Sequence, residues 1–277
     1  MLRPMLESLR MDNKRVIVTG AGRGLGRQMA LHLADAGADI VCAARTEAEL
    51  ASVATEIEAR GRRALVVPID VTDSSQVDSL VERTLAEWGG FEVMIANAGG
   101  GGAAAGAQVD QISDHDWRDT IDLNLSSVFY CARAAAAHFH ERGGGNIITV
   151  ASSTAMRGEA QLLVYGVAKA GVIALTQGLA TQLARAQIRV NCIVPGFMLQ
   201  QTPHEPEAIE LARSQGARIP VGRQGEAWEL GPVAVYLTSD ASAYVTGETF
   251  VIDGGGLAAG LAPTGWDVTS GIGSVPR

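Results

Sequence analysis

The stretch RVIVTGAGRGLG, residues 15 to 26, joins a short apolar run to a cluster of glycines and the start of a helical pattern. The apolar run predicts a buried strand over 15–19, and the pattern after the glycines predicts a helix over 25–36. Glycines at such a turn let the backbone approach a pyrophosphate, while the helix N-terminus offers free N–H groups and positive dipole charge to it. The spacing here is GxxxGxG, and the alternative is a purely structural turn. Because the turn joins the first strand to the first helix of a βαβ unit, we predict a cofactor site formed by Gly20, Arg23, Gly24, Leu25 and Gly26.

The rest of the chain repeats this alternation of apolar runs and longer helical patterns. Continuous apolar strands linked by helices indicate a parallel sheet that is buried on both faces. We therefore predict an α/β protein, a single-domain doubly wound Rossmann fold with a parallel sheet of about seven strands flanked by helices. The predicted strands are 15–19, 39–43, 64–69, 91–96, 146–151, 189–194 and 249–252, and the predicted helices are 25–36, 47–60, 74–88, 114–140, 164–186 and 226–237.

The composition limits the kinds of binding partner that we expect. The chain has 277 residues, 47% of them hydrophobic, and a formal net charge of −8. No basic run is interleaved with aromatics, so nucleic acid and membrane surfaces are not expected partners. Residues 1–14 lack a sustained apolar segment, and no unbroken apolar run is long enough to span a bilayer, which predicts a cytoplasmic protein. Cys42, Cys131 and Cys192 are expected to be buried free thiols, and we assign no metal site.

The end of the second predicted strand bears on the choice of cofactor. A carboxylate usually stands here when the ribose hydroxyls of NAD(H) are recognised. This chain has Ala44 and Arg45 instead, and the arginine suits a phosphate, with Arg23 as a second cation. NADP(H) is therefore favoured, with NAD(H) as the alternative. The competing interpretation is that Arg45 is a solvated residue at a helix start.

Two further strand ends supply candidate cofactor residues. Asp70 and Val71 follow the third strand and are expected to hold the adenine. Asn97, Ala98 and Gly99 follow the fourth strand and are expected to form the floor of the cofactor site, although Asn97 also suits a role in bracing the neighbouring loops. The small residues of 99–107 either border the substrate or form a low-complexity insertion.

Three proton-handling side chains are expected to meet near residues 152–169. Tyr165 and Lys169 are spaced i and i+4 within good helix formers, so they should share a helix face. A neighbouring ammonium favours the phenolate and should lower the pKa of the phenol. Ser152 ends an apolar strand and offers a hydroxyl to a substrate oxygen. A YxxxK pair alone is weak evidence, because such pairs are common on solvated helices.

Taken together, these segments resemble the short-chain dehydrogenase/reductase superfamily, from about Lys14 to Gly256. The similar elements are TGAGRGLG (19–26), DV (70–71), NAG (97–99), NLSS from Asn124, Ser152, YGVAK (165–169), PG (195–196) and TGETFVIDGG. The resemblance is greatest to the group of 3-oxoacyl-[acyl-carrier-protein] reductases and sugar and hydroxysteroid dehydrogenases.

The resemblance implies a role for each matched residue. Tyr165 would exchange the proton at the substrate oxygen, and Ser152 would orient the substrate. Lys169 would lower the pKa of Tyr165 and bond the nicotinamide ribose. Asn124 would hold a water that links Lys169 to solvent, although a polar residue that kinks a helix is equally compatible. The cofactor would also be contacted by Pro195, Gly196, Met198 and Gln200. Members usually have a threonine soon after the PG pair, and here either Gln200 or Thr202 takes its place.

The resemblance also implies a division of the chain and an assembly. Residues 1–13 would be an N-terminal extension, 14–256 the dehydrogenase domain with a substrate lid at about 197–222, and 257–277, with Trp266, a C-terminal tail that docks on a neighbouring subunit or has no fixed structure. The lid residues Met198, Leu199, Ile209 and Leu211 predict an apolar pocket. The expected reaction is hydride transfer between the nicotinamide and a ketone or secondary alcohol with apolar bulk. The expected assembly is a homotetramer, with a dimer as the alternative. A non-catalytic NADP(H)-binding sensor and a nucleotide-sugar epimerase or dehydratase are the alternatives.

Overall fold

A seven-stranded parallel sheet forms the centre of the molecule. The computed structural model describes residues 4–201, 203–217 and 219–258. The strands are paired in the order β3-β2-β1-β4-β5-β6-β9, so the strand order reverses between β1 and β4. Ligands in such sheets bind outside the carboxyl ends of the strands at this reversal. The strands are β1 (Arg15–Thr19), β2 (Asp39–Ala44), β3 (Ala64–Pro68), β4 (Val93–Ala96), β5 (Gly145–Val150), β6 (Ile188–Pro195) and β9 (Thr249–Ile252).

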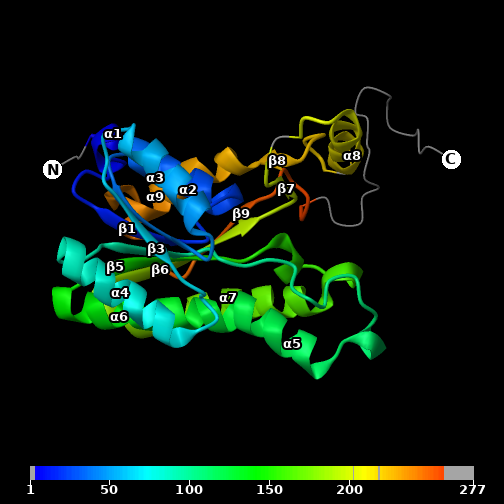
Figure 1. The fold of residues 1–277 in the computed structure, drawn as a ribbon, viewed down its shortest axis with the longest axis horizontal. Coiled ribbons are helices and arrows are strands. Elements are labelled where there is room, and N and C mark those ends of the chain that lie inside the picture. Colours follow the sequence, from blue (N-terminus) through cyan, green and yellow to red (C-terminus); the bar gives the residue numbers. More distant parts are fainter. Residues whose placement is uncertain (1–3, 202, 218, 259–277) are drawn as a thin grey trace.

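Helices cover both faces of the sheet, as Figure 1 shows. One face packs against α2 (Gly24–Asp35), α3 (Glu47–Glu58) and α9 (Gly231–Thr238). The other packs against α4 (Ser74–Trp88), α6 (Ser127–Arg142) and α7 (Leu163–Leu183). Each face therefore has its own apolar core, which confirms the predicted doubly wound fold.

The burial pattern explains why the central strands form where they do. Ile17 and Val18 on β1 are both fully buried although their side chains point to opposite faces. A strand between two helical layers needs apolar residues at consecutive positions, and the sequence supplies them. On α7 the buried side chains include Val164, Ala168 and Val172, spaced four residues apart, so one stripe of this helix faces the sheet.

The predicted helix over 114–140 is present, but it is not α-helical throughout. The structure has α5 (Asp114–Ile121), a π-helical turn (Asp122–Ser126) and α6, so the helix is continuous in direction but widened at Asn124. Such π turns are frequent at functional sites because one extra residue re-aims a side chain. The predicted helix over 226–237 is likewise divided, with a 3₁₀ turn over Ala227–Leu230 before α9.

Two strands and two α-helices lie outside the predicted pattern. A two-stranded parallel pair, β7 (Met198–Leu199) and β8 (Gly225–Glu226), follows the end of β6. Helix α8 (Pro206–Gly216) lies beyond this pair at one end of the molecule in Figure 1. Near the N-terminus, α1 (Met5–Ser8) precedes Met11, whose side chain is fully buried in the α2–α3–α9 core.

One helical stretch, Ala160–Ala186, is long and apolar enough to pass a test for a membrane span by length and composition alone. The same composition is found in the core helices of soluble proteins, and α7 contacts the sheet through its buried stripe. Its other faces expose Leu163 and Val167. The three cysteines are buried and free, as expected from the sequence.

Candidate active site

A cleft of about 1670 Å³ opens at the carboxyl ends of the strands. The structure brings every predicted cofactor residue into its lining, together with the three predicted proton-handling side chains. These residues are Gly20, Arg23, Gly24, Leu25, Gly26, Ala44, Arg45, Asp70, Val71, Asn97, Ala98, Gly99, Ser152, Tyr165, Lys169, Pro195, Gly196, Met198 and Gln200. Asn124 does not line the cleft and lies behind Gly99.

The glycine loop forms one end of the cleft through close backbone contacts. Gly20 and Gly24 have φ values of +68° and +55°, which glycine adopts more readily than residues with a Cβ. A Cβ on Gly26 would lie 2.2 Å from the Gly20 carbonyl oxygen and 2.5 Å from Asn97 Nδ2. The loop and the start of α2 are therefore pressed together, and α2 presents its N-terminal N–H groups at this end of the cleft. This cradle fits a dinucleotide pyrophosphate.

Asn97 fixes the glycine loop to the end of β4. Its Nδ2 donates to the Thr19 carbonyl oxygen at 2.9 Å, and its backbone N–H donates to Thr19 Oγ1 at 3.1 Å. The bracing role that was the alternative for this residue is therefore present. Asp70 has a similar local role, because its Oδ1 accepts hydrogen bonds from the backbone N–H and the hydroxyl of Thr72 at 2.9 and 2.8 Å. Both residues still face the cleft.

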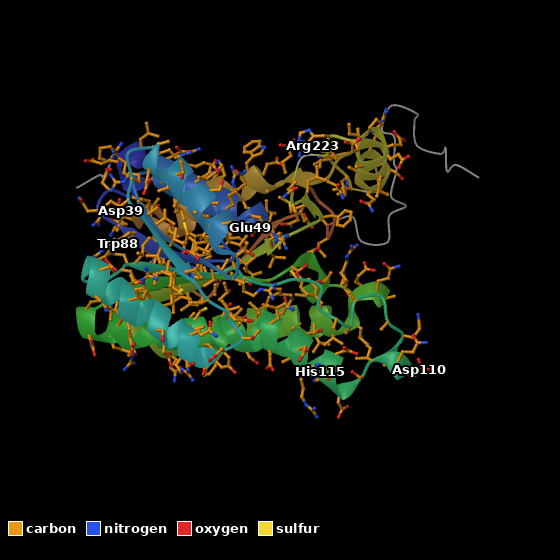
Figure 2. The ribbon with its side chains drawn as sticks, in the orientation of Figure 1. Asp39, Glu49, Trp88, Asp110, His115 and Arg223 are labelled. Carbon is orange, nitrogen blue, oxygen red and sulfur yellow. The ribbon has the colours of Figure 1, made fainter. Side chains whose placement is uncertain are left out.

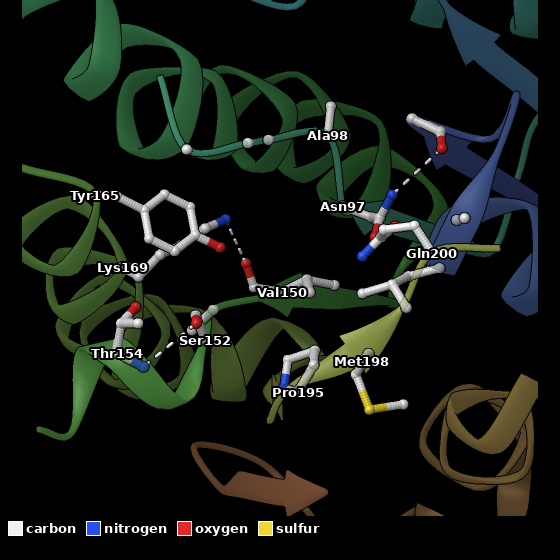
Figure 3. Close-up of a pocket in the computed structure, with 18 of the residues that line it drawn as sticks. Asn97, Ala98, Val150, Ser152, Thr154, Tyr165, Lys169, Pro195, Met198 and Gln200 are labelled. Atoms are coloured by element: carbon white, nitrogen blue, oxygen red, sulfur yellow. Dashed lines mark hydrogen bonds between the residues drawn. The ribbon is translucent and has the colours of Figure 1, made fainter. Parts of the chain in front are cut away.

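Tyr165, Lys169 and Ser152 gather where β5 ends, as Figure 3 shows. Lys169 Nζ lies 5.6 Å from the centroid of the Tyr165 ring and donates to the Val150 carbonyl oxygen at 2.9 Å. Ser152 Oγ accepts from the backbone N–H of Thr154 at 3.3 Å, which starts a 3₁₀ turn. A Cβ on Gly166 would lie 3.2 Å from the Thr154 carbonyl oxygen, so glycine lets this turn and α7 approach.

Burial shifts the pKa of the phenol and of the amine in opposite directions. It raises the pKa of Tyr165, and hydrogen bonding with Ser152 offsets part of that rise. It lowers the pKa of Lys169 from 10.5 to about 8, because the ammonium is almost completely removed from water. The sequence predicted that Lys169 would lower the pKa of Tyr165, and the direction in the structure is the reverse. Desolvation of the phenol outweighs an amine that lies over the ring and is bonded to Val150.

Asn124 is fully buried in the π turn and joins it to the loop after β4. Its Oδ1 accepts from the Gly100 N–H at 3.0 Å, and its Nδ2 donates to the carbonyl oxygens of Gly100 and Thr120 at 2.9 and 3.0 Å. A Cβ on Gly99 would lie 2.7 Å from Asn124 Oδ1 and 3.1 Å from Lys169 Nζ, so both groups converge on this glycine. The π turn therefore contains the residue whose side chain lies on the same glycine as Lys169 Nζ.

Gln200, one of the two residues expected in place of the usual threonine, lies over the glycine loop. Its Oε1 would lie 2.2 Å from a Cβ on Gly24. Figure 3 shows it near the Asn97 end of the cleft, away from Tyr165. The short β7 strand directs the chain toward the loop at this point. The alternative residue, Thr202, lies outside the described residues.

The predicted apolar lining of the lid is only partly present. Met198 lines the cleft, but Leu199, Ile209 and Leu211 do not, and the last two side chains are exposed on α8. From this segment the cleft receives Phe197 and Ile219 together with the amides of Gln201 and Gln215. No helix was predicted over 206–216, so nothing in the sequence indicated that Gln215 lies toward the cleft.

Several lining residues were missed by the sequence analysis. Arg157, Glu159 and Gln161 lie between Ser152 and Tyr165 and line the cleft, with Arg157 Nη2 3.7 Å from Glu159 Oε2. Thr154 Oγ1 is buried and finds no partner among the described residues. Glu49, from the first turn of α3, also lines the cleft. These residues lie in a loop between two motif residues and at a helix N-terminus, where the sequence has no periodic pattern. The available signal was their closeness in sequence to the motifs.

A glycine cradle at the strand reversal and a Ser–Tyr–Lys group at the next strand end define a nucleotide-dependent oxidoreductase cleft. The family model described as Enoyl-(Acyl carrier protein) reductase matches residues 20–256. The chain is 37% identical to the 2-dehydro-3-deoxy-D-gluconate 5-dehydrogenase of Escherichia coli K12, over 92% of this chain and 99% of that protein. It is 33% identical to the 3-oxoacyl-[acyl-carrier-protein] reductase FabG of Thermotoga maritima, over 89% and 99%.

A solved structure agrees with these relatives. The gluconate 5-dehydrogenase of Burkholderia cenocepacia, in complex with NADP and tartrate, superposes with a TM-score of 0.83 at 32% identity, over 92% of this chain and all of that one. The chain belongs to the short-chain dehydrogenase/reductase family, near the FabG and sugar dehydrogenase group. It is an oxidoreductase of that family, as the sequence motifs predicted.

Proposed function

We propose that this protein is an NADP(H)-dependent oxidoreductase that interconverts a ketone and a secondary alcohol, with Tyr165 as the acid/base. The observation that carries the proposal is the meeting of Ser152, Tyr165 and Lys169 in the same cleft as the glycine cradle. Hydride transfer to a carbonyl needs a proton for the oxygen, and a positioned phenol supplies it. NAD(H) is the alternative cofactor.

The residues present fit the dinucleotide. Gly20, Gly24 and the start of α2 would hold the pyrophosphate, and Asp70 and Val71 the adenine. Arg23 and Arg45 would bind the 2′-phosphate of NADP(H), which supports the preferred cofactor. Pro195, Gly196 and Met198 would border the nicotinamide, and Gln200 would contact the pyrophosphate end, where its amide lies. When bound, the nicotinamide supplies a hydride to the carbonyl carbon, or accepts one from the carbinol carbon.

The chain's own groups handle the proton. Ser152 donates a hydrogen bond to the substrate oxygen and orients it toward Tyr165. As the ketone is reduced, Tyr165 gives its proton to that oxygen, and negative charge develops on the phenol. The Lys169 ammonium, 5.6 Å from the ring centroid, stabilises this charge. Lys169 would return a proton to Tyr165, and a water held by Asn124 would link Lys169 to solvent.

The substrate class that the cleft supports best is a hydroxylated ketone with a carboxylate. Apart from the Lys169 ammonium, the lining that follows Ser152 in the described chain has one cation, Arg157, together with Glu159 and Gln161. An arginine binds a carboxylate, and the Glu and Gln side chains suit hydroxyl groups. The names of the relatives, which act on 2-dehydro-3-deoxy-D-gluconate and gluconate, favour the same class. Phe197, Leu162 and Ile219 leave an apolar wall for the carbon chain.

We propose that residues 197–222 cover the substrate and that 14–256 is the catalytic unit, with the 257–277 tail beyond it largely outside the described residues. We further propose a cytoplasmic homotetramer. A shallow hollow between α6 and α7, which Phe129, Arg133 and Leu179 help to line, supports an interface there, as do the exposed Leu163 and Val167.

The test is Tyr165→Phe, which removes the hydroxyl and keeps the ring. We expect kcat for reduction of 5-keto-D-gluconate with NADPH to fall by about 10²–10⁴-fold, while the Kd for NADPH, measured by fluorescence titration, changes by less than about twofold. Tyr130→Phe, a substitution of a tyrosine that does not line the cleft, is the control. Full activity in Tyr165→Phe would refute the acid/base role.

The sensor alternative predicts a different result. A non-catalytic sensor would bind NADPH with saturation but turn over no ketone in a panel of sugar acids, 3-oxo esters and steroid ketones. Consumption of NADPH that depends on any of these ketones excludes it. An epimerase or dehydratase would convert a nucleotide sugar without net use of NADPH, which the same assay separates.

A further inference from the structure

Glu49 faces the nucleotide end of the cleft from the first turn of α3. It lines the cleft beside Gly22, Arg45 and Thr46. A Cβ on Gly22 would lie 3.0 Å from Glu49 Oε2 and 3.0 Å from Glu49 Cβ, so the side chain lies against the glycine loop. Figure 2 shows it at the opposite end of the α3 region from Asp39, which is at the amino end of β2.

The carboxylate of Glu49 is not used by its own helix. The sequence Thr46-Glu-Ala-Glu49 has the pattern of a capping box, in which the first and fourth side chains bond each other's backbone N–H groups. In the structure Thr46 is the N-cap of α3, but its side chain makes no capping hydrogen bond. Within the described part of the chain, no hydrogen bond or ion pair to the Glu49 carboxylate is formed. A half-buried carboxylate at a cleft, free of its usual local partner, is available to a ligand.

The charges near Glu49 bear on which cofactor the site prefers. Arg23 and Arg45 line the same corner and likewise form no ion pair with the described residues. Two cations alone would favour a phosphate on the adenosine ribose. A carboxylate beside them repels that phosphate and accepts hydrogen bonds from free ribose hydroxyls. The residue that usually does this, at the end of β2, is Ala44 here.

We propose that Glu49 recognises the adenosine ribose hydroxyls of NAD(H) and opposes the 2′-phosphate of NADP(H), so that the protein uses both cofactors. The proposal rests on the dinucleotide site of the proposed function. Arg23 and Arg45 favour NADP(H), Glu49 limits that preference, and the ratio of the two affinities is set by their balance. Replacement of Ala44 by an acid is therefore not needed for NAD(H) binding.

The experiment measures equilibrium binding of NADPH and NADH by fluorescence titration, without substrate and at fixed ionic strength. Glu49→Gln removes the charge and keeps the shape. We expect the Kd for NADPH to fall and that for NADH to rise, so that the ratio of the two changes by about tenfold. The matched control is Glu47→Gln, which removes the same charge from the same helix turn at an exposed position that does not line the cleft. There we expect less than a twofold change.

Three results would overturn the proposal. One is an unchanged affinity ratio in Glu49→Gln. Another is the same shift in Glu47→Gln, since the effect would then be a general one of helix charge. The third is a loss of affinity for both cofactors alike, because Glu49 would then support the loop rather than discriminate. Titration with 2′-AMP and 5′-AMP gives a second measure, and only 2′-AMP should bind more tightly to Glu49→Gln.

Failure of the proposed function gives a distinguishable outcome. If the wild-type protein binds neither NADPH nor NADH, the assignment of the dinucleotide site is wrong, and the proposal for Glu49 is wrong as well. If it binds both but turns over no ketone, the catalytic proposal fails while the Glu49 proposal is still tested in full by the affinity ratios.

Discussion

The two ends of the cleft are built by different means. At the nucleotide end the contacts are between backbone segments, and a Cβ on Gly26 would meet the Gly20 carbonyl oxygen at 2.2 Å. At the substrate end the lining comes from loops and from side chains such as Arg157, which is 55% exposed, and a Cβ on Gly100 would meet nothing within 4 Å. The nucleotide end is therefore fixed by the fold, whereas the substrate end is free to vary in sequence.

The largest effect should come from adding a methyl group at the nucleotide end, in Gly26→Ala. The same change at the substrate end, in Gly100→Ala, is the comparison. In Gly26→Ala the new Cβ overlaps a backbone oxygen, which cannot move without shifting β1 or α2. We expect the free energy of unfolding to fall by about 3 kcal/mol or more, and NADPH affinity to fall at least roughly tenfold. Gly100→Ala should change the unfolding free energy by less than about 0.5 kcal/mol.

Urea denaturation and NADPH titration of both variants provide the measurement. Equal effects of the two substitutions would show that the ends of the cleft do not differ in rigidity. A stable Gly26→Ala that binds NADPH normally would show that the close approach at the glycine loop is not required.

Lys169 lies between the two ends, and its burial has a stability cost that depends on pH. Its pKa is about 8 in the folded protein, against 10.5 for the free side chain. Between these values the unfolded chain binds a proton that the folded chain does not, so stability rises with pH across this window and the penalty is fully present below pH 8. The shift corresponds to about 3 kcal/mol. Lys169→Met should therefore be more stable than wild type near pH 7, by about 2–3 kcal/mol, while losing activity.

The check is the free energy of unfolding of wild type and Lys169→Met from pH 7 to 10.5. Their difference should shrink as pH rises through the window. Lys14→Met, which removes a lysine paired at the surface with Asp240, tests whether loss of a lysine elsewhere gives the same pH dependence. A constant difference for Lys169→Met, or an equal change for Lys14→Met, would contradict the assigned burial cost.

The same contrast explains what the sequence could and could not predict. Strand ends and the glycine loop are local in sequence, so their residues were assigned to one cleft correctly. The π turn at Asn124 was missed, because one extra residue in a helical turn leaves the apolar pattern almost unchanged. The position of Gln200 was missed because it depends on the two-residue β7 strand, whose pairing with β8 is set by residues more than 20 positions away.

The pKa shift of Tyr165 was predicted in the wrong direction for a related reason. Spacing along a helix shows that Tyr165 and Lys169 are neighbours, and the structure confirms this. It does not show how completely each group is removed from water or that Val150 competes for the amine. Desolvation depends on packing from β5 and the loop after β4, and no local pattern records it.

A smaller effect is expected from Arg45, at the nucleotide end. Arg45→Ala should raise the Kd for NADPH by about tenfold and change the Kd for NADH by less than about twofold. The reason is that the guanidinium would bind only the 2′-phosphate. Arg27→Ala, which removes an arginine paired with Glu56 outside the cleft, is the control. Fluorescence titration with both cofactors decides the point, and an equal loss for NADPH and NADH would show that Arg45 does not recognise the phosphate.

The smallest effect should come from Arg157, at the substrate end, because an exposed ion pair of this kind contributes about 1 kcal/mol. Arg157→Gln should raise the KM for 5-keto-D-gluconate by about fivefold, leave kcat and the NADPH affinity unchanged, and leave the KM for the methyl ester of that acid unchanged. Arg157→Lys should restore part of the affinity, since the charge is kept and the fork geometry lost. If the acid and its ester respond alike, Arg157 does not bind the carboxylate, and the substrate end must select by shape and hydroxyl contacts alone.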